Sequence, residues 1–445
     1  MKVTVVGIGR LGAPYAASLA EIGHDVLGVE SDPRTLAELR ADRAPFDEPD
    51  LGETIAKHAA TGRMRFTDSY DQAVAFADVH FVCVPTPQQH GALAADLSYI
   101  EAAVTGLARR ARRDCLIVAK SSVPVGTAQR LGDQAAAAAR PGVTVSVAYS
   151  PDFLRESTSM QDAARPSRII VGIPEQRPQD DTLLRTIWGP WTGAGVRLIV
   201  TNLETAELAK SAANAFLATK ISYINFIGAL CEQTGADIRD LSLSMGLDPR
   251  IGPAMLDAGL GFGGSCIPKD IRALYERATE LHVPEAAFLK DIDAINIRRR
   301  RRVVALAREA AGGTLTGKRI AIWGAAFKPG TDDLRDSPAL AVALDLHTAG
   351  ADVVVHDPKA LPAVRQQAPR LKTADSLDKA LDGAHVLLHL TGWEPYRHAD
   401  PTALVDRIAT PAVIDARGTL DRAVWSRVGW AFTTLGARPV SPTPA

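Results

Sequence analysis

The chain has 445 residues, of which 46% are hydrophobic and 23% are charged, a composition that excludes wholesale disorder. Its 50 Lys and Arg balance its 51 Asp and Glu, so charge gives no reason to expect nucleic acid as a partner. No apolar run reaches the roughly 18 residues of a membrane helix, and the length predicts two or three domains.

The first 200 residues predict an α/β domain. Val3–Val6 is a short β-branched run, followed by the glycine loop Gly7–Gly12, a helical pattern and a second run at Val26–Val29 that ends at Glu30. This order is typical of a βαβ unit. Further apolar runs lie at 79–84, 116–119, 143–148, 169–172 and 198–200. We therefore expect a Rossmann-like domain over 1–200, built on a mostly parallel sheet.

Residues 201–312 predict a helical central domain. A pattern without proline over 204–234 would form a helix about 45 Å long that acts as a spine. A second helical stretch at 270–312 contains Arg298–Arg302. Five consecutive arginines wind around all sides of a helix, so we interpret them as a solvated, partly subunit-facing surface rather than a nucleic-acid patch.

The last part of the chain predicts a second α/β domain over 313–437. Strand patterns at 319–323, 353–358, 386–390 and 412–415 repeat the rhythm of the first domain without its three-glycine loop. The tail, 438–445, has no periodicity and is expected to be disordered. The predicted fold is thus two doubly wound α/β domains joined by a long central helix.

The glycine loop predicts a dinucleotide site. Gly7 permits a tight turn, Gly9 allows the backbone to approach a pyrophosphate, and Gly12 lets helix and strand pack closely. Glu30 is placed to accept ribose hydroxyls and repels a 2′-phosphate, which favours NAD over NADP, although Arg34 weakens that preference. The alternative is a structural turn without a ligand.

Cys266 is the candidate nucleophile. It follows a glycine-rich segment that begins at Gly261, where a ligand or another backbone comes close. A thiol at a helix start is activated by the helix dipole, and Asp270 would share its helical face. The alternative is a small buried cysteine beside a glycine turn.

Lys210 and Asn214 lie four residues apart on the long helix and would form a cationic oxyanion site. Alone, Lys210 would be a solvated helix lysine. Cys83, Cys115 and Cys231 lie in apolar patterns and are predicted to be core residues. Histidines do not cluster at ligand spacing, so no metal site is expected. The spaced cysteines and the absence of a secretion signal predict a cytoplasmic protein with reduced thiols.

These motifs resemble the nucleotide-sugar 6-dehydrogenase family, also called the UDP-glucose/GDP-mannose dehydrogenase family. The matching segments span nearly the whole chain: Gly7–Gly12, 48–51, 84–87, 120–127, 151–156, Lys210–Asn214, 250–252, Gly261–Asp270, 326–337 and 415–417. Arg250-Ile251-Gly252 and Ser265-Cys266 with Asp270 favour the UDP-glucose branch.

The resemblance implies oxidation of C6 of a nucleotide-diphosphate hexose, with UDP-glucose as the expected substrate. Cys266 would form a thiohemiacetal and then a thioester, while Lys210 and Asn214 stabilise the oxyanion, an effect of about 2.7–4 kcal/mol per donor. Asp270 with Ser122 would hold water, and Asp152 would be the base for hydrolysis. Asp152 stands where the family has glutamate, and Ser122 where it has threonine.

The resemblance also implies sets of binding residues. The NAD set is Gly7, Ile8, Gly9, Arg10, Leu11, Gly12, Glu30, Arg34, Pro85, Thr86, Ser122, Glu156, Lys269 and Arg335. The substrate set is Asp152, Phe153, Leu154, Arg155, Glu156, Lys210, Asn214, Arg250, Leu260, Gly261, Phe262, Gly263, Phe327, Lys328 and Arg417. By analogy Arg250 reaches a neighbouring subunit, so we expect a homodimer through the long helix or a larger oligomer, and no nucleic-acid or membrane partner.

Two other functions remain open at this stage. The same reaction on dTDP-glucose or another nucleotide hexose would use the same motifs, since base recognition lies in loops and backbone contacts. A catalytically silent nucleotide-binding protein is the alternative from another class, and the intact Cys266, Lys210, Asn214 and Asp270 argue against it. A simple β-hydroxyacid dehydrogenase would need neither Cys266 nor the second α/β domain.

Overall fold

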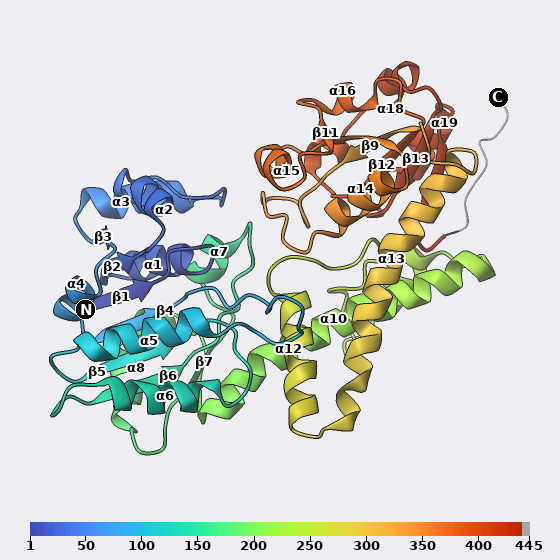
Figure 1. Cartoon of the computed structure of the whole chain (residues 1–445). Coiled ribbons are helices and arrows are strands. Elements are labelled where there is room, and N and C mark those ends of the chain that lie inside the picture. The colour runs from blue at the N-terminus through green and yellow to red at the C-terminus, as the bar shows by residue number, and fades with distance from the viewer. Residues whose placement is uncertain (438–445) are drawn as a thin grey trace. The chain divides into compact units, whose positions relative to one another are not determined.

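The computed structural model describes residues 1–437 (Figure 1), so the predicted disordered tail, 438–445, lies outside the described residues. The chain divides into two compact units. The first comprises residues 1–213 and 272–283, and the second comprises 214–271 and the chain from 284 onward.

The first unit is built on an eight-stranded sheet. Its strands lie in the order β3 (Met64–Thr67), β2 (Asp25–Val29), β1 (Lys2–Val6), β4 (Val79–Val82), β5 (Cys115–Ala119), β6 (Val145–Tyr149), β7 (Ile169–Gly172) and β8 (Leu198–Thr201). Neighbours are parallel except β6 and β7, which meet antiparallel through Tyr149 and Gly172. The predicted mostly parallel sheet is confirmed.

Helices cover both faces of this sheet. Along β1, Val5 packs with α1 (Gly12–Glu21), α3 (Leu51–Ala60) and α8 (Gln179–Ile187), whereas Val6 packs with α4 (Tyr70–Phe76), α5 (Ser98–Arg110) and α6 (Thr127–Ala138). Successive strand residues point to opposite faces, and both faces are buried, which is why these strands are continuous apolar runs. Shorter helices complete the unit: α2 (Pro33–Arg40), α7 (Ser159–Ala164) and α9 (Gly189–Gly193).

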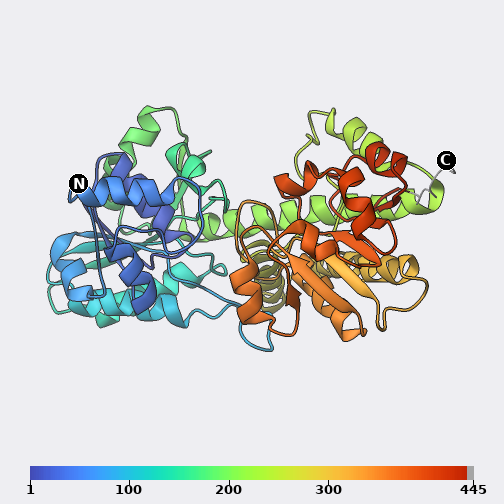
Figure 2. The same cartoon turned by 90° about the horizontal axis from the view of Figure 1, so that it is seen from above.

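The long predicted helix is α10 (Leu203–Thr234), green in Figures 1 and 2. Its 32 residues contain no proline, and at 1.5 Å per residue the helix is about 48 Å long. It begins in the first unit and continues into the second. Among residues 1–437, neither α10 nor any other helix is long and apolar enough to cross a membrane.

The helical stretch predicted at 270–312 is interrupted. Helix α12 (Ile267–Glu280) is followed by the short η1 (Pro284–Ala287) and by α13 (Phe288–Ala310), while α11 (Ile238–Gly246) lies between α10 and α12. Pro284 explains the break, because proline disfavours helical backbone in the residue before it. His282 adopts a positive φ of 58° at the same place.

The interpretation of Arg298–Arg302 as a solvated surface is wrong for three of its members. Arg299 is 5% exposed and pairs with Glu232 of α10, whose carboxylate also binds the fifth arginine of the run. Arg300 pairs with Asp336 at 2.9 Å. Only the first and fourth arginines are exposed. The run therefore carries internal ion pairs of the second unit, since a helix turns successive residues in different directions.

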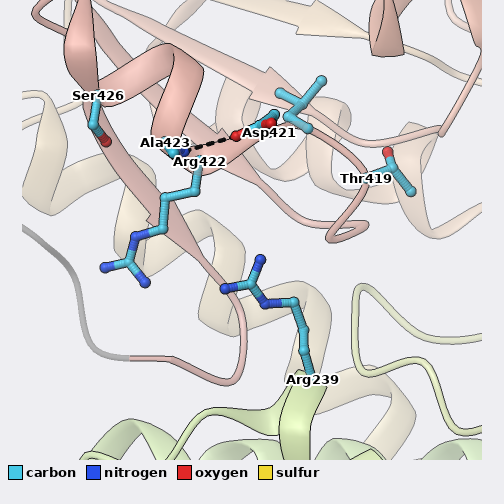
Figure 3. Close-up of a pocket in the computed structure, with 7 residues that line it drawn as sticks. Arg239, Thr419, Asp421, Arg422, Ala423 and Ser426 are labelled. Atoms are coloured by element: carbon cyan, nitrogen blue, oxygen red, sulfur yellow. Dashed lines mark hydrogen bonds between the residues drawn. The ribbon is translucent and has the colours of Figure 1, made fainter. Parts of the chain in front are cut away.

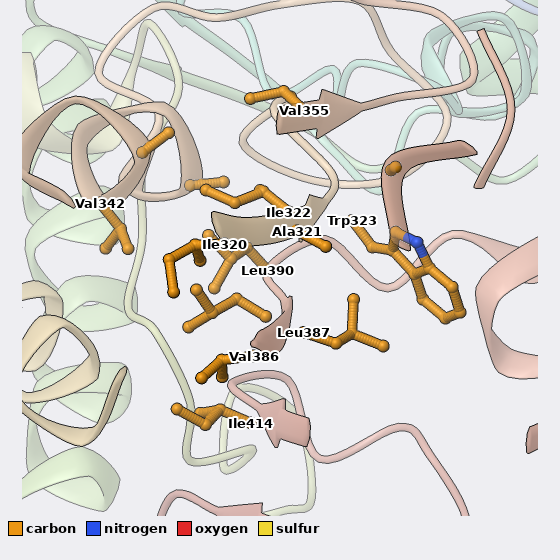
Figure 4. Packing of buried hydrophobic residues seen from close by; sticks show 14 of the residues in the cluster. Ile320, Ala321, Ile322, Trp323, Val342, Val355, Val386, Leu387, Leu390 and Ile414 are labelled. Carbon is orange, nitrogen blue, oxygen red and sulfur yellow. The ribbon is translucent and has the colours of Figure 1, made fainter. Parts of the chain in front are cut away.

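The second unit contains a parallel six-stranded sheet. Its order is β11 (Lys372–Thr373), β10 (Asp352–His356), β9 (Arg319–Trp323), β12 (Val386–His389), β13 (Ala412–Asp415) and β14 (Ala431–Thr434). Figure 4 shows its core, where residues of β9 and β12 pack against Val342 of α14 (Pro338–Thr348). The predicted fold class is confirmed, with two doubly wound sheets.

The remaining helices of this unit are α15 (Leu361–Gln367), α16 (Leu377–Leu381), α17 (Glu394–Arg397), α18 (Pro401–Leu404), η2 (Val405–Arg407) and α19 (Arg422–Arg427). Both sheets reverse their strand order beside their first strand, between β1 and β4 and between β9 and β12. In doubly wound sheets, ligands bind outside the carboxyl ends of the strands at this switch point.

Candidate active site

The glycine loop at the end of β1 has the geometry of a dinucleotide site. Gly7 has a φ of 86°, and a Cβ on Gly12 would lie 1.8 Å from the Gly7 carbonyl oxygen. A Cβ on Gly9 would meet nothing within 4 Å. The loop thus has a tight turn at Gly7, a close contact with the helix at Gly12 and open space beside Gly9. Helix α1 begins at Gly12, and the free N–H groups of a helix start bind phosphates. The residues present fit a dinucleotide.

Glu30 is held beside this loop at the end of β2. Its Oε2 accepts the Ile8 N–H at 2.9 Å, and its Oε1 accepts the N–H groups of Ser31 and Asp32. The carboxylate is therefore fixed by the backbone segments that follow β1 and β2. Arg34 is exposed on α2. Ribose recognition by these residues stays a prediction.

A buried carboxyl with two ammonium groups forms the centre of the first unit. Burial raises the pKa of Asp152, while Lys120 and Lys210 lower it. Lys210 is 6% exposed, with its Nζ 5.4 Å from the Phe153 ring centroid. Lys120 Nζ lies 4.3 Å from the Tyr15 ring centroid, and burial lowers its pKa. Sequence reasoning gave Lys120 no role, although it opens a matched motif.

The segment with Ser122 is attached to the predicted cofactor turn. Thr86 Oγ1 donates to the Ser122 carbonyl at 2.8 Å, and Ser121 Oγ donates to the Val84 carbonyl at 2.6 Å. The structure thus brings Ser122 and Thr86 together, with Pro85 exposed between the two hydrogen bonds. Both segments follow strands that neighbour one another in the sheet, β4 and β5.

The segment after β6 is ordered by a distant glutamate. Both oxygens of Glu48, which is 7% exposed, accept backbone N–H groups, from Ser157 and Ser159, each at 2.9 Å. Arg155 is bound to Asp162 of α7 at 2.6 Å. Two further predicted residues are placed here: the Leu154 N–H donates to Asp152 at 3.1 Å, and Glu156 lies 3.9 Å from Arg10.

Cys266 begins helix α12, as predicted. The Asp270 N–H donates to the Cys266 carbonyl at 2.8 Å, which makes Cys266 the residue that precedes the first helical turn. Its side chain is exposed, and its Sγ lies 3.5 Å from the Ser265 hydroxyl. The positive end of the helix dipole therefore lies at the sulfur that the sequence predicts to be the nucleophile.

The other three thiols are buried, which confirms their prediction as core residues. Burial raises the pKa of Cys83 to about 12 and that of Cys115 to about 11, and it also raises the pKa of Cys231. Thiolate chemistry is therefore disfavoured at all three sites. Cys266 alone combines exposure with a helix start.

Asp270 connects the cysteine helix to α10 within the second unit. It is 3% exposed, and its Oδ2 accepts the Asn214 side-chain amide at 2.6 Å. Its Oδ1 accepts the Lys269 ammonium at 2.7 Å. The carboxylate thus orients the amide that was predicted to stabilise an oxyanion. It also binds the ammonium of Lys269, whose contact with the cofactor stays a prediction.

The glycines before Cys266 lie where other parts of the protein pack closely against the backbone. Asn296 of α13 is fully buried and binds the backbone of Phe262 twice, accepting its N–H at 2.8 Å and donating to its carbonyl at 3.0 Å. A Cβ on Gly261 would lie 2.1 Å from the Asn296 Oδ1, and one on Gly264 would lie 2.8 Å from the Phe327 ring. Close packing thus requires these glycines.

Arg417 ties this loop to the second sheet. Its guanidinium donates to the carbonyls of Leu390, Gly261 and Phe327 at 2.6, 3.2 and 3.2 Å. Burial lowers its pKa to about 10. Three of its N–H groups therefore bind backbone carbonyls, and its contact with a substrate phosphate stays a prediction.

The second switch point differs from the first in its acidic residue. Asp357 ends β10 as Glu30 ends β2, but it is 1% exposed. One of its oxygens accepts the N–H groups of Ala325 and Ala326 and the indole N–H of Trp393. This carboxylate is enclosed by its own domain and does not face a ribose, which agrees with the missing three-glycine loop.

The remaining predicted residues are placed as follows. Leu260 is fully buried in the core of the second sheet, and a Cβ on Gly263 would lie 2.4 Å from the Asp336 carbonyl. Arg335 is 52% exposed and binds Asp333. Arg250 is 87% exposed and binds Asp248 of its own turn, and the Lys328 Nζ lies 5.7 Å from the Phe327 ring.

In the first unit the structure brings Ser122 to Thr86 and Asp152 to Lys210. In the second unit it connects Cys266 to Asn214 through Asp270, and it connects the loop over 261–264 to Phe327 and Arg417. An open pocket of about 600 Å³ lies elsewhere in the second unit, where Arg239 of α11 and Arg422 of α19 point toward one another (Figure 3). It contains none of the predicted site residues.

The sequence matches three models of the UDP-glucose/GDP-mannose dehydrogenase family: the NAD binding domain over 1–192, the central domain over 204–298 and the UDP binding domain over 321–422. It is 36% identical to a UDP-glucose 6-dehydrogenase of Rhizobium meliloti, covering 98% of this chain and 99% of the relative. A UDP-glucose 6-dehydrogenase of Pseudomonas aeruginosa is 37% identical, covering 98% and 97%. The UDP-glucose dehydrogenase structure of Pyrobaculum islandicum superposes with a TM-score of 0.87 at 35% identity, covering 94% of each chain.

Proposed function

The chain belongs to the UDP-glucose/GDP-mannose dehydrogenase family, and from this premise we propose that it is an NAD-dependent UDP-glucose 6-dehydrogenase. It oxidises the C6 hydroxymethyl group of UDP-glucose to a carboxylate and yields UDP-glucuronate. The relatives at 36 and 37% identity carry that activity in their names and match over nearly their whole length.

One observation carries the catalytic part of the proposal. Of the four cysteines, all of which lie within residues 1–437, Cys266 alone is exposed, and it lies at the positive end of α12. A two-step oxidation to a carboxylate needs a nucleophile that holds the aldehyde between the steps, and a thiolate at a helix start provides it. A single oxidation of an alcohol would need no such group.

The proposed reaction balances in four steps. The alcohol loses a hydride and a proton to give the aldehyde. The Cys266 sulfur adds to the aldehyde carbon and forms a thiohemiacetal, which loses a second hydride and proton to give a thioester. Water adds to the thioester carbon, the carbon–sulfur bond breaks, and the carboxylate and the thiol are released. When bound, two successive NAD molecules supply the acceptors for the two hydrides.

Lys210 and Asn214 stabilise the oxyanion in this proposal. Lys210 is almost fully buried, so its charge acts with little screening by water. The Asn214 amide is pre-oriented by Asp270, so it needs no reorganisation when charge develops. That these groups act with Cys266 on one substrate is part of the proposal and rests on the family motif.

Asp152 is the proposed base for thioester hydrolysis. Burial raises the pKa of its carboxyl. A higher pKa makes the carboxylate a stronger base, and a general base is most effective when its pKa lies near the working pH. Ser122 and Asp270 are proposed to hold the water. The two departures from the family motifs keep the functional groups. Ser122 has the hydroxyl of the family's threonine, and Asp152 has the carboxyl of the family's glutamate.

The cofactor is proposed to lie at the first switch point. Its pyrophosphate would contact the Gly7–Gly12 loop, and Glu30 would contact its ribose. The nucleotide sugar is proposed to contact the second unit through Phe327, Lys328 and Arg417. The division into domains 1–200, 201–312 and 313–437 remains part of this proposal.

We further propose that a second copy of the chain covers an apolar face of α10. Phe216, Tyr223 and Leu230 recur every seven residues and are 66, 47 and 47% exposed, with Phe226 beside them at 46%. A seven-residue apolar repeat is the pattern by which helices pack on one another. The highly exposed Arg250 lies in the same unit and is proposed to reach the neighbouring subunit.

The decisive experiment measures NADH absorbance with purified chain, NAD and UDP-glucose. We expect two NADH per UDP-glucuronate, and slower turnover with dTDP-glucose and GDP-mannose. Cys266→Ser should stop turnover and leave NAD binding intact, whereas Cys231→Ser should change neither. Turnover of the Cys266→Ser variant at the wild-type rate would exclude the covalent mechanism.

Two further measurements test the finer parts. Asp152→Asn should slow hydrolysis, so that intact-mass spectrometry detects a thioester adduct during turnover; no adduct would count against this base. Phe226→Glu should dissociate the dimer in sedimentation experiments, while Leu281→Glu, at a site 51% exposed, should not. The reduced thiol that the mechanism needs agrees with a cytoplasmic location, which stays a prediction.

A further inference from the structure

Glu207 is a fully buried glutamate that the proposed mechanism does not use. It lies on α10 one turn before Lys210, and it is 0% exposed. One of its carboxylate oxygens accepts the Gly126 N–H at 2.7 Å, and the other accepts the Ala128 N–H at 2.6 Å. A residue of α10 therefore binds the backbone at the start of α6, about 80 positions earlier in the sequence.

The start of α6 needs this acceptor. The first N–H groups of a helix have no partner within the helix, and the residue before it usually supplies a side-chain oxygen. Here that residue is Gly126, which has a φ of 91° and no side chain. Glu207 takes over the capping role from another element, and both hydrogen bonds are charge-assisted when its carboxyl is ionised.

The segment capped in this way is the one that carries Ser122. Its other contacts come from two further elements: Arg277 of α12 donates to the Val125 carbonyl at 3.0 Å, and Thr86 donates to the Ser122 carbonyl at 2.8 Å. All these groups lie in the first unit. The segment over 120–128 is thus fixed at both ends, and Glu207 is its connection to α10.

We propose that Glu207 is a positioning residue that fixes the Ser122 segment relative to Lys210. The roles of Ser122 and Lys210 rest on the proposed function, whereas the connection itself rests on the two hydrogen bonds. Lys210 follows Glu207 by less than one turn of the same helix, so the two residues keep a fixed distance. If the segment over 120–128 moved away from Glu207, it would therefore also move relative to the Lys210 ammonium.

Placing a carboxylate here carries a cost in free energy. Burial raises the pKa of Glu207 to about 7, against the opposing effect of its backbone hydrogen bonds, and Glu204 adds to the rise. A capping serine at position 126 is disfavoured, because the φ of 91° there favours glycine. The acceptor for the start of α6 therefore comes from another element, and because that element is α10, the cap is also a connection between α6 and α10.

The test compares Glu207→Gln with the wild type in two measurements. Glutamine has nearly the same size, but its NH2 group would face a backbone N–H, so one of the two hydrogen bonds is lost. We expect faster hydrogen exchange confined to residues 120–128. We also expect kcat with UDP-glucose to fall about 10- to 100-fold, the effect of a small misplacement, with KM for UDP-glucose changed less than about twofold.

Two variants serve as controls. Asp180→Asn removes another buried carboxyl of the first unit, one that accepts from Ser146, and should lower the unfolding temperature without changing kcat or exchange at 120–128. Glu207→Asp keeps both acceptor oxygens on a shorter side chain and should recover part of kcat and of the exchange protection.

The outcomes separate this inference from the proposed function. Wild-type kcat in Glu207→Gln together with faster exchange would overturn the positioning role, and unchanged exchange would overturn the connection. If the wild-type chain failed to oxidise UDP-glucose, the proposed function would fall, while faster exchange confined to 120–128 would still support the connection through Glu207.

Discussion

Replacing Asn296 with alanine should loosen the loop that leads to Cys266. The fully buried Asn296 side chain supplies both hydrogen-bond partners of the Phe262 backbone, which is itself enclosed. Alanine leaves a buried N–H and a buried carbonyl without partners, at about 1–3 kcal/mol each. The expected cost is therefore about 2–6 kcal/mol. A value of about 3 kcal/mol raises the population of the detached loop about 100-fold.

Hydrogen exchange at the Phe262 amide measures this directly, because exchange reports the opening of a protected N–H. We expect it to accelerate about 100-fold in Asn296→Ala. The matched control is Ser222→Ala, which removes a buried hydroxyl that donates to the Ile292 carbonyl one turn earlier on α13. That variant should lose stability and leave Phe262 protected. Wild-type protection of Phe262 in Asn296→Ala would refute the reasoning.

Three further predictions follow from buried groups. Gly12→Ala should abolish NAD binding in titration calorimetry, because its Cβ would lie 1.8 Å from the Gly7 carbonyl oxygen. Glu48→Gln should lower kcat and accelerate exchange over 157–159, because one of two amide bonds to its carboxylate is lost. Burial lowers the pKa of His80 and His389 from 6.5 to about 4, so the folded chain binds fewer protons than the unfolded chain between these values. Stability should therefore fall as the pH drops from 6.5 to 4, by up to about 3 kcal/mol per histidine, in denaturant titrations.

Each of these predictions has a contrary result. NAD binding by Gly12→Ala at wild-type affinity would mean that the loop does not contact the cofactor. Unchanged exchange in Glu48→Gln would mean that its carboxylate does not order the segment. Replacing His80 and His389 by glutamine should flatten the acid dependence, and an unaltered slope would assign it to other groups.

The fold could be predicted largely from strand patterns. The runs at Val3–Val6 and Val26–Val29 are buried on both faces, and such strands are visible as continuous β-branched segments. Three edge strands were missed. Met64–Thr67 includes an exposed arginine, Lys372–Thr373 has only two residues and neither is buried, and Ala431–Thr434 is only partly buried, so none of them forms an apolar run. The antiparallel contact of β7 was also missed, because an apolar run carries no direction.

The candidate site was predictable where one local element carries the signal. Cys266 and Asp270 share one helix, and the glycine loop is one turn. The groups that hold them in place were not predictable. Asn296 and Glu207 accept backbone N–H groups that are 34 and about 80 residues away. Every residue except proline has a backbone N–H, so the residue types do not indicate which N–H a distant side chain binds. Glu207 gave one weak signal, its place on the helical face of Lys210.

The distribution of the four cysteines allows alkylation to report which unit unfolds. Cys83 and Cys115 lie in the first unit, and Cys231 and Cys266 lie in the second, with all but Cys266 buried. In the native state, a pulse of alkylating reagent should add one label. One further label would report opening of the second unit, two would report opening of the first, and three would report global unfolding. Peptide mapping of the labels would therefore order the unfolding steps of the two units without any introduced probe.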